Sequence, residues 1–341
     1  DAGTSARRIP LVTDDAVFVQ FRVTEPLMLS PFTFGDPNGK QGFYGIQTMN
    51  IQMNMQSNAN RAWRSVKFGN FTKTASIVSF ENSQLTFHFL TPHASQMLSS
   101  RNVVPYYELP VYRTTNFEAI PARTSWSMRA DGTFETPQAR SIQSSNQLNG
   151  IPDKLIIFVR KVAGTMTCCD TDSYLTIQNI RINFNNQAGL LSSMTQEQLY
   201  TNSVLSGLRN MSYEDFKGIT INVSGANGAA SEPFNPYSGV GARIVGANRV
   251  AGFKYIPTTG SLLVLNFAEV VQLTDEYYAP GSLGTFNLQL QVDVINNQKD
   301  TLPANGAELI IIPLNSGVFV NERGTSSTFI SLLTKQDVLD S

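Results

Sequence analysis

The chain has 341 residues, which is enough for one large β domain or for two domains of ordinary size. Only 15% of the residues are charged, the net charge is −1, and no basic block is longer than Arg7-Arg8, which argues against direct packaging of nucleic acid. Scarce charge favours surfaces that pack against partners, because charge is depleted at interface cores; a neutral β-rich surface without a partner is the alternative.

Apolar residues that recur at every second position predict β-strands through the first half of the chain. Residues 17–23, 48–55 and 85–89 each alternate in this way. Residues 155–159 (LIIFV) are apolar at every position. This run predicts a central strand that is covered on both of its faces.

The same period continues through the second half of the chain. Within residues 175–184 the apolar positions change phase by one residue at Gln178-Asn179, which predicts a β-bulge. Pro280-Gly281 predicts a type II turn, because Pro fixes a negative φ and Gly supplies the positive φ that follows. Roughly fourteen to sixteen strands fit the whole chain, among them strands over 262–265, 286–294, 308–312 and 318–320.

Helices are expected to be few and short. Residues 195–205 predict a helix that is capped by Ser193 or Thr195 and ends at Gly207. Residues 212–216 predict a single turn of helix. Residues 224–248 are rich in Gly, Ala, Asn and Ser, and we expect a long irregular excursion there.

The predicted strand over 286–294 has an unusual outer face. Its even positions are all apolar, whereas its odd positions are mostly amides. We expect the apolar side chains to form the inner face of a sandwich. We expect the amides to meet another sheet, helix or subunit, because amides can form hydrogen bonds there without the desolvation cost of charge. The candidate interface residues, with the equivalent amides of the earlier alternating segment, are Asn287, Gln289, Gln291, Asn50, Gln52 and Asn54.

Residues that carry catalysis or bind metals are scarce. The pair Cys168-Cys169 is adjacent, and two thiols alone make neither an easy bridge nor a zinc site. His88 and His93 lack convergent partners at their spacing, and Asp170-x-Asp172 predicts a polar turn rather than a calcium loop. No hydrolase, Walker or dinucleotide motif is present. The sequence therefore predicts no catalytic residue, no cofactor and no metal site.

Five segments that span most of the chain have a recognisable pattern and order. They are TEPLMLSPFTFGD (24–36), GFYGIQTMNIQMNMQSNANRAWRS (42–65), IPDKLIIFVRK (151–161), IQNIRINFNNQAGLLSSMTQEQLYTNSVLSGL (177–208) and APGSLGTFNLQLQV (279–292). Together they resemble the major capsid proteins of Polinton-like and adintovirus-type DNA viruses. The resemblance implies a hexon-like double jelly roll, in which two antiparallel sandwiches stand side by side and few short helices lie in loops. It also implies that three copies form a pseudo-hexagonal capsomer that tiles an icosahedral shell.

The resemblance implies a first jelly roll over 1–165 and a second over 166–341, with a single jelly roll carrying large insertions as the alternative. It implies a non-enzymatic shell subunit in the virion capsid, assembled in the nucleus or cytoplasm of a host cell. The partners implied are further copies of the chain, penton proteins and minor capsid proteins, without sequence-specific binding of nucleic acid; an internal membrane is left open.

The alternative function is a carbohydrate-binding or glycan-processing jelly roll, because two carboxylates need no sequence motif to hydrolyse a glycoside. Such a site needs aromatic side chains beside carboxylates. The candidate groups are Tyr106 and Tyr107 near Glu108, and Tyr277 and Tyr278 near Asp275 and Glu276.

Overall fold

The structure is a computed structural model. It describes residues 44–52, 84–86, 99–124, 137–167, 172–185, 187–223, 253–271, 279–298 and 300–334, together with isolated positions such as Ser30, His93, Asp170 and Asp337. The expected strand over 17–23, the pair Cys168-Cys169, His88 and the excursion over 224–248 lie outside the described residues.

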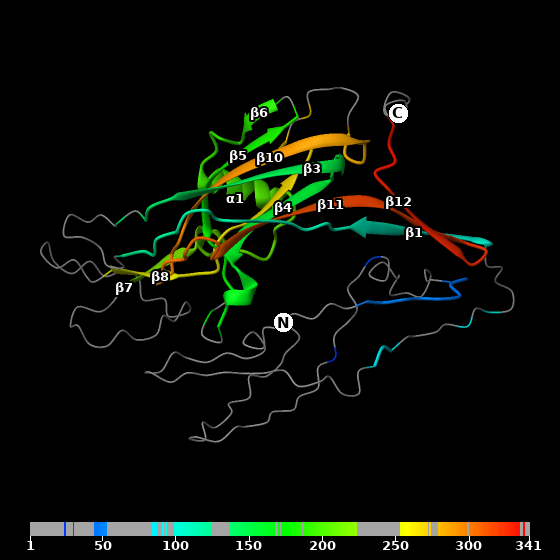
Figure 1. The fold of residues 1–341 in the computed structure, drawn as a ribbon, viewed down its shortest axis with the longest axis horizontal. Coiled ribbons are helices and arrows are strands. Elements are labelled where there is room, and N and C mark those ends of the chain that lie inside the picture. Colours follow the sequence, from blue (N-terminus) through cyan, green and yellow to red (C-terminus); the bar gives the residue numbers. More distant parts are fainter. Residues whose placement is uncertain are drawn as a thin grey trace, which may run out of the picture.

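Two antiparallel sheets form a sandwich, and a third, two-stranded sheet lies at one end of it (Figure 1). The larger sheet has the order β1-β11-β4-β9, with β2 and β12 also paired to β11. Its strands are β1 (Arg101–Glu108), β2 (Tyr112–Thr115), β4 (Lys154–Lys161), β9 (Leu262–Asn266), β11 (Ala307–Glu322) and β12 (Thr325–Ile330). The other strands are β3 (Arg140–Gly150), β10 (Leu283–Ile295), β5 (Thr176–Phe184) and β6 (Gln187–Leu190), in that order in the four-stranded sheet, and the pair β7 (Ile219–Val223) and β8 (Phe253–Pro257).

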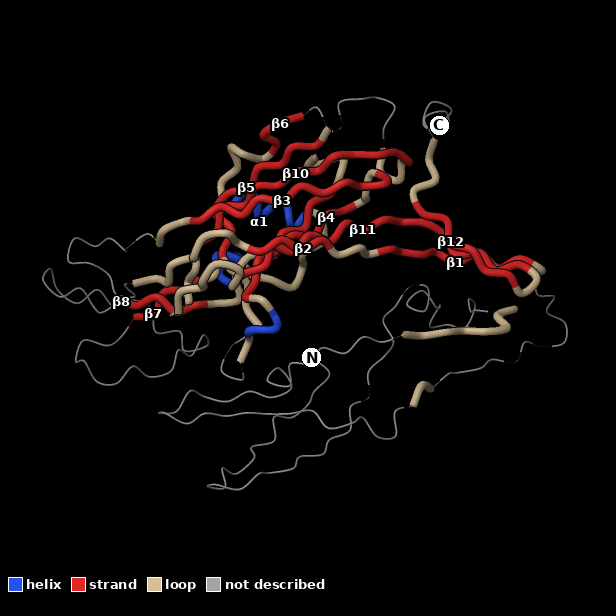
Figure 2. Tube along the Cα trace, in the orientation of Figure 1, coloured by secondary structure: helices blue, strands red, loops and turns tan. Residues whose placement is uncertain are grey.

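The hydrophobic core lies between the two larger sheets. In β10 all the even positions from Phe286 to Val294 are buried, which confirms the predicted inner face. They pack in one cluster with inward residues of β4 and β5, such as Ile157 and Ile182. The β1, β11 and β12 strands continue beyond the sandwich as a three-stranded ribbon (Figures 1 and 2).

The predicted β-bulge is confirmed in β5. Asp293 of β10 pairs with Asn179, but its neighbour Val294 pairs with Ile177, so Gln178 is the extra residue. The bulge explains the phase change in the sequence, because one unpaired residue lets apolar side chains on both sides of it point inward. Ile177 and Ile180 are accordingly both fully buried.

The predicted central strand is β4, which lies between β11 and β9. Its inward residues Leu155, Ile157 and Val159 are buried, whereas Ile156 and Phe158 on the outer face are half-buried. The expectation of full cover on both faces is therefore wrong for the outer face. Its cover there includes Tyr174, whose ring centroid lies 5.0 Å from that of Phe158.

Both predicted helices are present in the described part of the chain. Helix α1 (Gln196–Leu205) begins with a capping box in which Thr195 and Gln198 bond each other's backbone N–H groups. Helix α2 (Tyr213–Lys217) is capped by Ser212. The described residues also contain the 3₁₀ turn η3 (Ala163–Thr165). None of the described helices is long and apolar enough to cross a membrane.

The predicted type II turn is confirmed at Pro280-Gly281. Gly281 has a φ of 90°, and the N–H of Ser282 donates to the carbonyl of Ala279 over 3.0 Å. The turn also bonds the loop before β4, because the N–H of Gly281 donates to the carbonyl of Ile151 over 2.7 Å. The turn therefore fixes the start of β10 beside β4.

Two other expected strands are wrong where the structure describes them. Residues 48–52 and 85–86 belong to no strand, and the rest of both segments lies outside the described residues. The segment 44–52 instead contacts the ribbon, where the Asn321 amide donates to the carbonyl of Tyr44 over 2.8 Å. Alternation predicts an extended chain, but a strand also requires a neighbour in register.

The expected division of the chain at residue 165 stays a prediction. Strands β1 to β4 precede this residue and β5 to β12 follow it. Because β3 pairs with β10 and β4 pairs with β11, each of the two larger sheets contains strands from both sides of residue 165.

The predicted polar turn at Asp170 is confirmed. Its carboxylate accepts hydrogen bonds from the Lys161 ammonium over 2.8 Å, from the backbone N–H of Thr167 over 2.6 Å and from the Thr167 hydroxyl over 3.0 Å. Partial burial raises the pKa of Asp170, but the hydrogen bonds from Lys161 and Thr167 outweigh that effect and hold the pKa below its usual value.

Replacing Asp170 with Asn is expected to lower the free energy of unfolding by about 1 kcal/mol at neutral pH, since both charged side chains keep some contact with solvent. The folded-state pKa lies below the unfolded value of about 3.9, so this contribution is present above about pH 4 and is lost as the pH falls through the folded pKa. Urea unfolding of both proteins along a pH series measures the difference. A difference that persisted unchanged down to about pH 2 would contradict this assignment.

Candidate interaction surface

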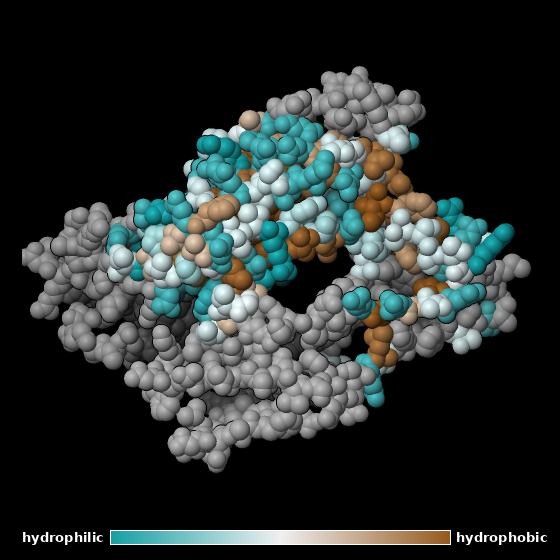
Figure 3. All heavy atoms as spheres, viewed as in Figure 1, coloured by the Kyte–Doolittle hydropathy of each residue, from teal (hydrophilic) through white to brown (hydrophobic). Residues whose placement is uncertain are grey.

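The outward side chains of β3, β10 and β5 form one continuous polar surface, which we call the amide face. Strand register places Asn287, Gln289 and Gln291 of β10 directly opposite Gln147, Ser145 and Gln143 of β3. On the other side of β10, Gln289 and Gln291 lie opposite Asn183 and Arg181 of β5. Figure 3 shows hydrophilic side chains over β5, β6 and β10 in the upper part of the molecule. The amide face consists of Ser141, Gln143, Ser145, Gln147, Asn287, Gln289, Gln291, Asp293, Asn179, Arg181 and Asn183.

The amide face carries little charge and is partly ordered by its own hydrogen bonds. The Asn183 amide donates to Oε1 of Gln289 over 3.5 Å, and the Gln291 amide donates to the Ser141 hydroxyl over 3.4 Å. Ser141 also bonds the Asp293 carboxylate, which with Arg181 is one of the two charged members of the face. On β5, the Asn179 amide donates to the Ser192 carbonyl over 3.1 Å, and Oδ1 of Asn183 accepts from the N–H of Gly189 over 2.8 Å. The exposed amides of β10 and β3 can bond a partner at a low desolvation cost.

The structure brings together three of the six predicted interface amides. Asn287 and Gln289 are exposed and Gln291 is half-buried, so no described sheet or helix of this chain covers them. Asn50 and Gln52 are exposed in the segment that contacts β11 at the ribbon, away from β10 (Figure 1). The sixth amide, Asn54, lies outside the described residues.

Four of the eleven residues of the amide face come from β3 and are not predictable from the sequence pattern. The inward positions of β3 are Ile142, Ser144, Asn146 and Leu148, so polar residues occur on both faces and the alternation is weak. The inward polar groups bond one another and β2: the Asn146 amide donates to Ser144, which also bonds Thr114. The sequence signal that could have identified this part of the face is the alternate polar run of β3, which consists of Gln143, Ser145 and Gln147.

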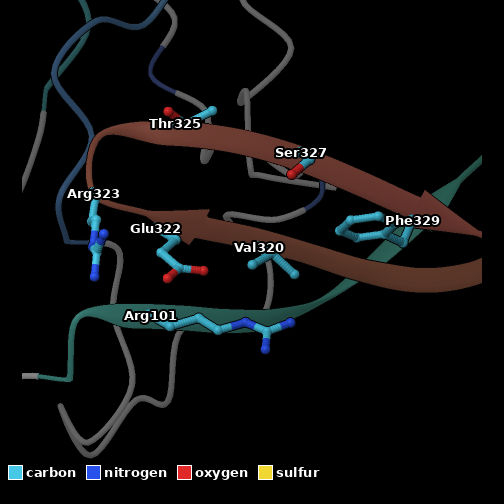
Figure 4. A pocket seen from close by; sticks show the side chains of 7 residues that line it. All are labelled: Arg101, Val320, Glu322, Arg323, Thr325, Ser327 and Phe329. Carbon is cyan, nitrogen blue, oxygen red and sulfur yellow. The ribbon is translucent and has the colours of Figure 1, made fainter.

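A second surface lies on the ribbon, where a hollow of about 370 Å³ opens on one face (Figure 4). Glu322 and Arg323 lie at the end of the hollow near the β11–β12 turn, the Arg101 side chain extends along the hollow toward Val320, and Phe329 lies at the other end. The hollow is lined by Arg101, Val320, Glu322, Arg323, Thr325, Ser327 and Phe329.

Of the residues proposed for a glycan site, the described group at 106–108 does not converge on one site. Tyr106 and Tyr107 are consecutive residues of β1 and point to opposite faces of the ribbon. The Glu108 carboxylate accepts a hydrogen bond from the Asn315 amide over 3.3 Å. The second candidate group, residues 275–278, lies outside the described residues. In the described part of the chain, no three His, Cys, Asp or Glu side chains are grouped so that they could hold a metal ion.

Comparison with protein families and with curated proteins gives consistent matches. The family described as the major capsid protein V20 C-terminal domain matches residues 126–317, and the family described as the Sputnik virophage major capsid protein 1st domain matches residues 2–90. The putative capsid protein V20 of Sputnik virophage is 27% identical over 330 residues, which cover 93% of this chain and 48% of that protein. The chain thus spans about half the length of the curated relative it matches.

Comparison with solved structures agrees with the sequence matches. A chain of the Sputnik virophage structure determined by cryo-EM has a TM-score of 0.56 and 26% identity, covering 74% of this chain and 43% of its own. The mavirus major capsid protein has a TM-score of 0.50 and 17% identity, covering 74% and 46%, and this likeness shows the fold alone. The expected all-β fold of the double jelly-roll type is confirmed.

Proposed function

We propose that this chain, which belongs to the family of major capsid proteins with a V20 C-terminal domain, is a structural subunit of a viral shell. The observation that carries the proposal is the match of this family to residues 126–317, more than half of the chain. The described sandwich fits the role, because its strands form a closed core and present long outer surfaces for neighbours. Its site in the mature particle is the virion capsid.

The amide face supports assembly of this chain with further copies of itself. Its outward residues are polar but largely uncharged, which suits a surface that is solvated before assembly and covered after it. We infer that Asn287, Gln289 and Gln291 contact a neighbouring subunit within a homotrimer, as the family resemblance implies. Penton and minor capsid proteins are the further partners implied, and assembly takes place inside the host cell.

We place the division between two jelly rolls before Arg101 rather than near residue 165. Two observations support this proposal. Every strand of the described sandwich begins at or after Arg101, and the two family matches are separated by the gap between residues 90 and 126. Proteolysis of the assembled protein at a cleavage site engineered near residue 95 should release a C-terminal fragment that retains its β-sheet circular dichroism.

Replacing Gln289 with Lys is expected to weaken self-association by about 100-fold, because an uncompensated charge buried at an interface costs roughly 3 kcal/mol. The free energy of unfolding should stay within about 0.5 kcal/mol, since Gln289 is exposed in the single chain. Light scattering coupled to size exclusion, followed by negative-stain electron microscopy, measures the loss of trimers and particles.

The matched control is Leu205→Lys, which adds the same charge at an exposed position at the end of α1, outside the amide face. It should assemble like the unmodified chain. If Gln289→Lys assembles as well as Leu205→Lys, the amide face is not a subunit interface. A chain that stays monomeric at all concentrations and forms no particles would count against the shell function itself.

A further inference from the structure

The free edge of β12 presents backbone groups that need a partner. β12 joins β11 through Arg323 and Gly324, whose φ values of 51° and 83° make a two-residue hairpin turn. The N–H of Ser331 donates to the carbonyl of Ser316 over 3.5 Å. Every second residue of β12 bonds β11 in the same phase, namely Phe329, Ser327 and Thr325. The N–H and C=O groups of Ser326, Thr328 and Ile330 therefore point away from β11.

This edge is open in the described part of the molecule. Residues 325–329 are exposed and Ile330 is half-buried. β12 pairs with β11 and with no other described strand. In Figure 4 the side chains of Thr325 and Ser327 stand at this outer strand, beside the hollow.

Parts of two other edges of the larger sheet are hydrogen-bonded by groups of the same chain. At β9 the hydroxyls of Ser203 and Ser206 accept hydrogen bonds from Val264 and Asn266, each over 3.2 Å. At β1 the Ser30 hydroxyl accepts from the N–H of Tyr107 over 2.8 Å. Covering of this kind prevents unwanted strand pairing, and no residue in the described ranges bonds the outer edge of β12 in this way.

The composition of β12 also lacks the usual protection of an edge. Its sequence, TSSTFI, contains no charged residue and no Pro, and its ladder to β11 has no bulge. Natural proteins place Lys, Pro or a bulge on an edge that must stay unpaired. An uncovered and unprotected edge therefore indicates a strand that is paired in the working assembly.

We propose that β12 pairs antiparallel with β12 of a second copy of this chain, around a twofold axis that passes beside Ser327. This register places Ser326 opposite Thr328 of the second copy, so that outward backbone groups meet outward backbone groups. The contact rests on the proposed shell function, because a short edge pairs weakly in isolated chains and firmly when many copies are held together.

The side chains fit the same register. Thr325 lies opposite Phe329 of the second copy, and pairing of a β-branched with an aromatic residue across strands is favourable. This contact covers Phe329, whose side chain is 39% exposed in the single chain. The two hollows meet on one face of the joined ribbons, because Thr325, Ser327 and Phe329 all line that face.

Disulfide trapping tests the register. In a Cys168→Ser, Cys169→Ser background, Ser327→Cys should form covalent dimers within assembled particles under mild oxidation. Residues that face each other across the axis in a non-hydrogen-bonded pair have Cα atoms about 4.5 Å apart, which a disulfide can span. The matched control is Thr328→Cys, which is equally exposed but lies on the other face and off the axis; it should cross-link at least tenfold more slowly.

Each outcome separates the β12 contact from the shell function. Particles that form without selective cross-linking at position 327 would overturn the β12 contact and leave the shell function standing. Selective cross-linking without particles would support the contact and count against the shell. Absence of both would overturn both.

A second variant removes the contact without a cysteine. Thr328→Pro deletes one outward N–H group and leaves the ladder to β11 intact, because this N–H does not face β11. It should reduce cross-linking at position 327 about tenfold with an unchanged Tm. Unchanged cross-linking would overturn the proposed backbone pairing.

Discussion

Replacing Phe286 with Ala should lower the free energy of unfolding by about 3–5 kcal/mol, the largest single effect expected in this molecule. Phe286 is 2% exposed and stacks on Phe184, with ring centroids 5.6 Å apart. Phe184 in turn contacts Phe267 edge to face at 5.2 Å, so the cavity would open at the centre of an aromatic cluster. Chemical denaturation, with its midpoint and slope fitted separately, measures the loss.

The matched control is Asn287→Ala, one residue further along the same strand. Its side chain points to the opposite face of β10 and is exposed, so the free energy of unfolding should change by less than about 0.5 kcal/mol. Similar losses for both variants would mean that the inner and outer faces of β10 have been assigned wrongly.

Replacing Arg160 with Met is expected to destabilise the chain by about 3 kcal/mol, because it leaves a buried carboxylate without its partner. Arg160 Nε lies 2.8 Å from Oε1 of Glu308, and the Glu308 side chain is only 7% exposed. The two residues lie opposite each other on β4 and β11, so the ion pair links two central strands of the larger sheet.

The double variant R160M/E308L should recover most of that loss, since apolar residues of similar volume replace buried ion pairs at little cost. Thermal and urea unfolding of both single variants and the double variant form a double-mutant cycle. If the losses of the two single variants simply add in the double variant, the buried pair is not what makes Arg160 important.

Features that depend on neighbours in the sequence are predictable here. The cap at Thr195, the turn at Pro280-Gly281 and the bulge at Gln178 each follow from the chemistry of a few adjacent residues. The inner face of β10 is predictable for the same reason, because strict alternation over residues 286–294 leaves one way to bury the apolar side chains.

Features that depend on distant partners are not predictable in the same way. The amides at 287–291 are visible in the sequence, but the amide face is complete only where β3 joins, with Gln147 opposite Asn287. The segment 48–52 shows the converse case, since it alternates as a strand does but pairs with none among the described residues. Alternation therefore identifies a face without identifying its neighbour.

By itself, the sequence determined the all-β class, the inward face of β10 and the low charge of the surfaces available to partners. Only the tertiary structure decided which strands lie beside β10 and which sheet edges the chain covers itself. The physical reason is that strand pairing joins backbone groups far apart in the chain, and backbone groups are the same in every residue. The position of β12 at an edge of the sheet depends on that pairing, whereas the lack of charged residues in β12 can be read from the sequence.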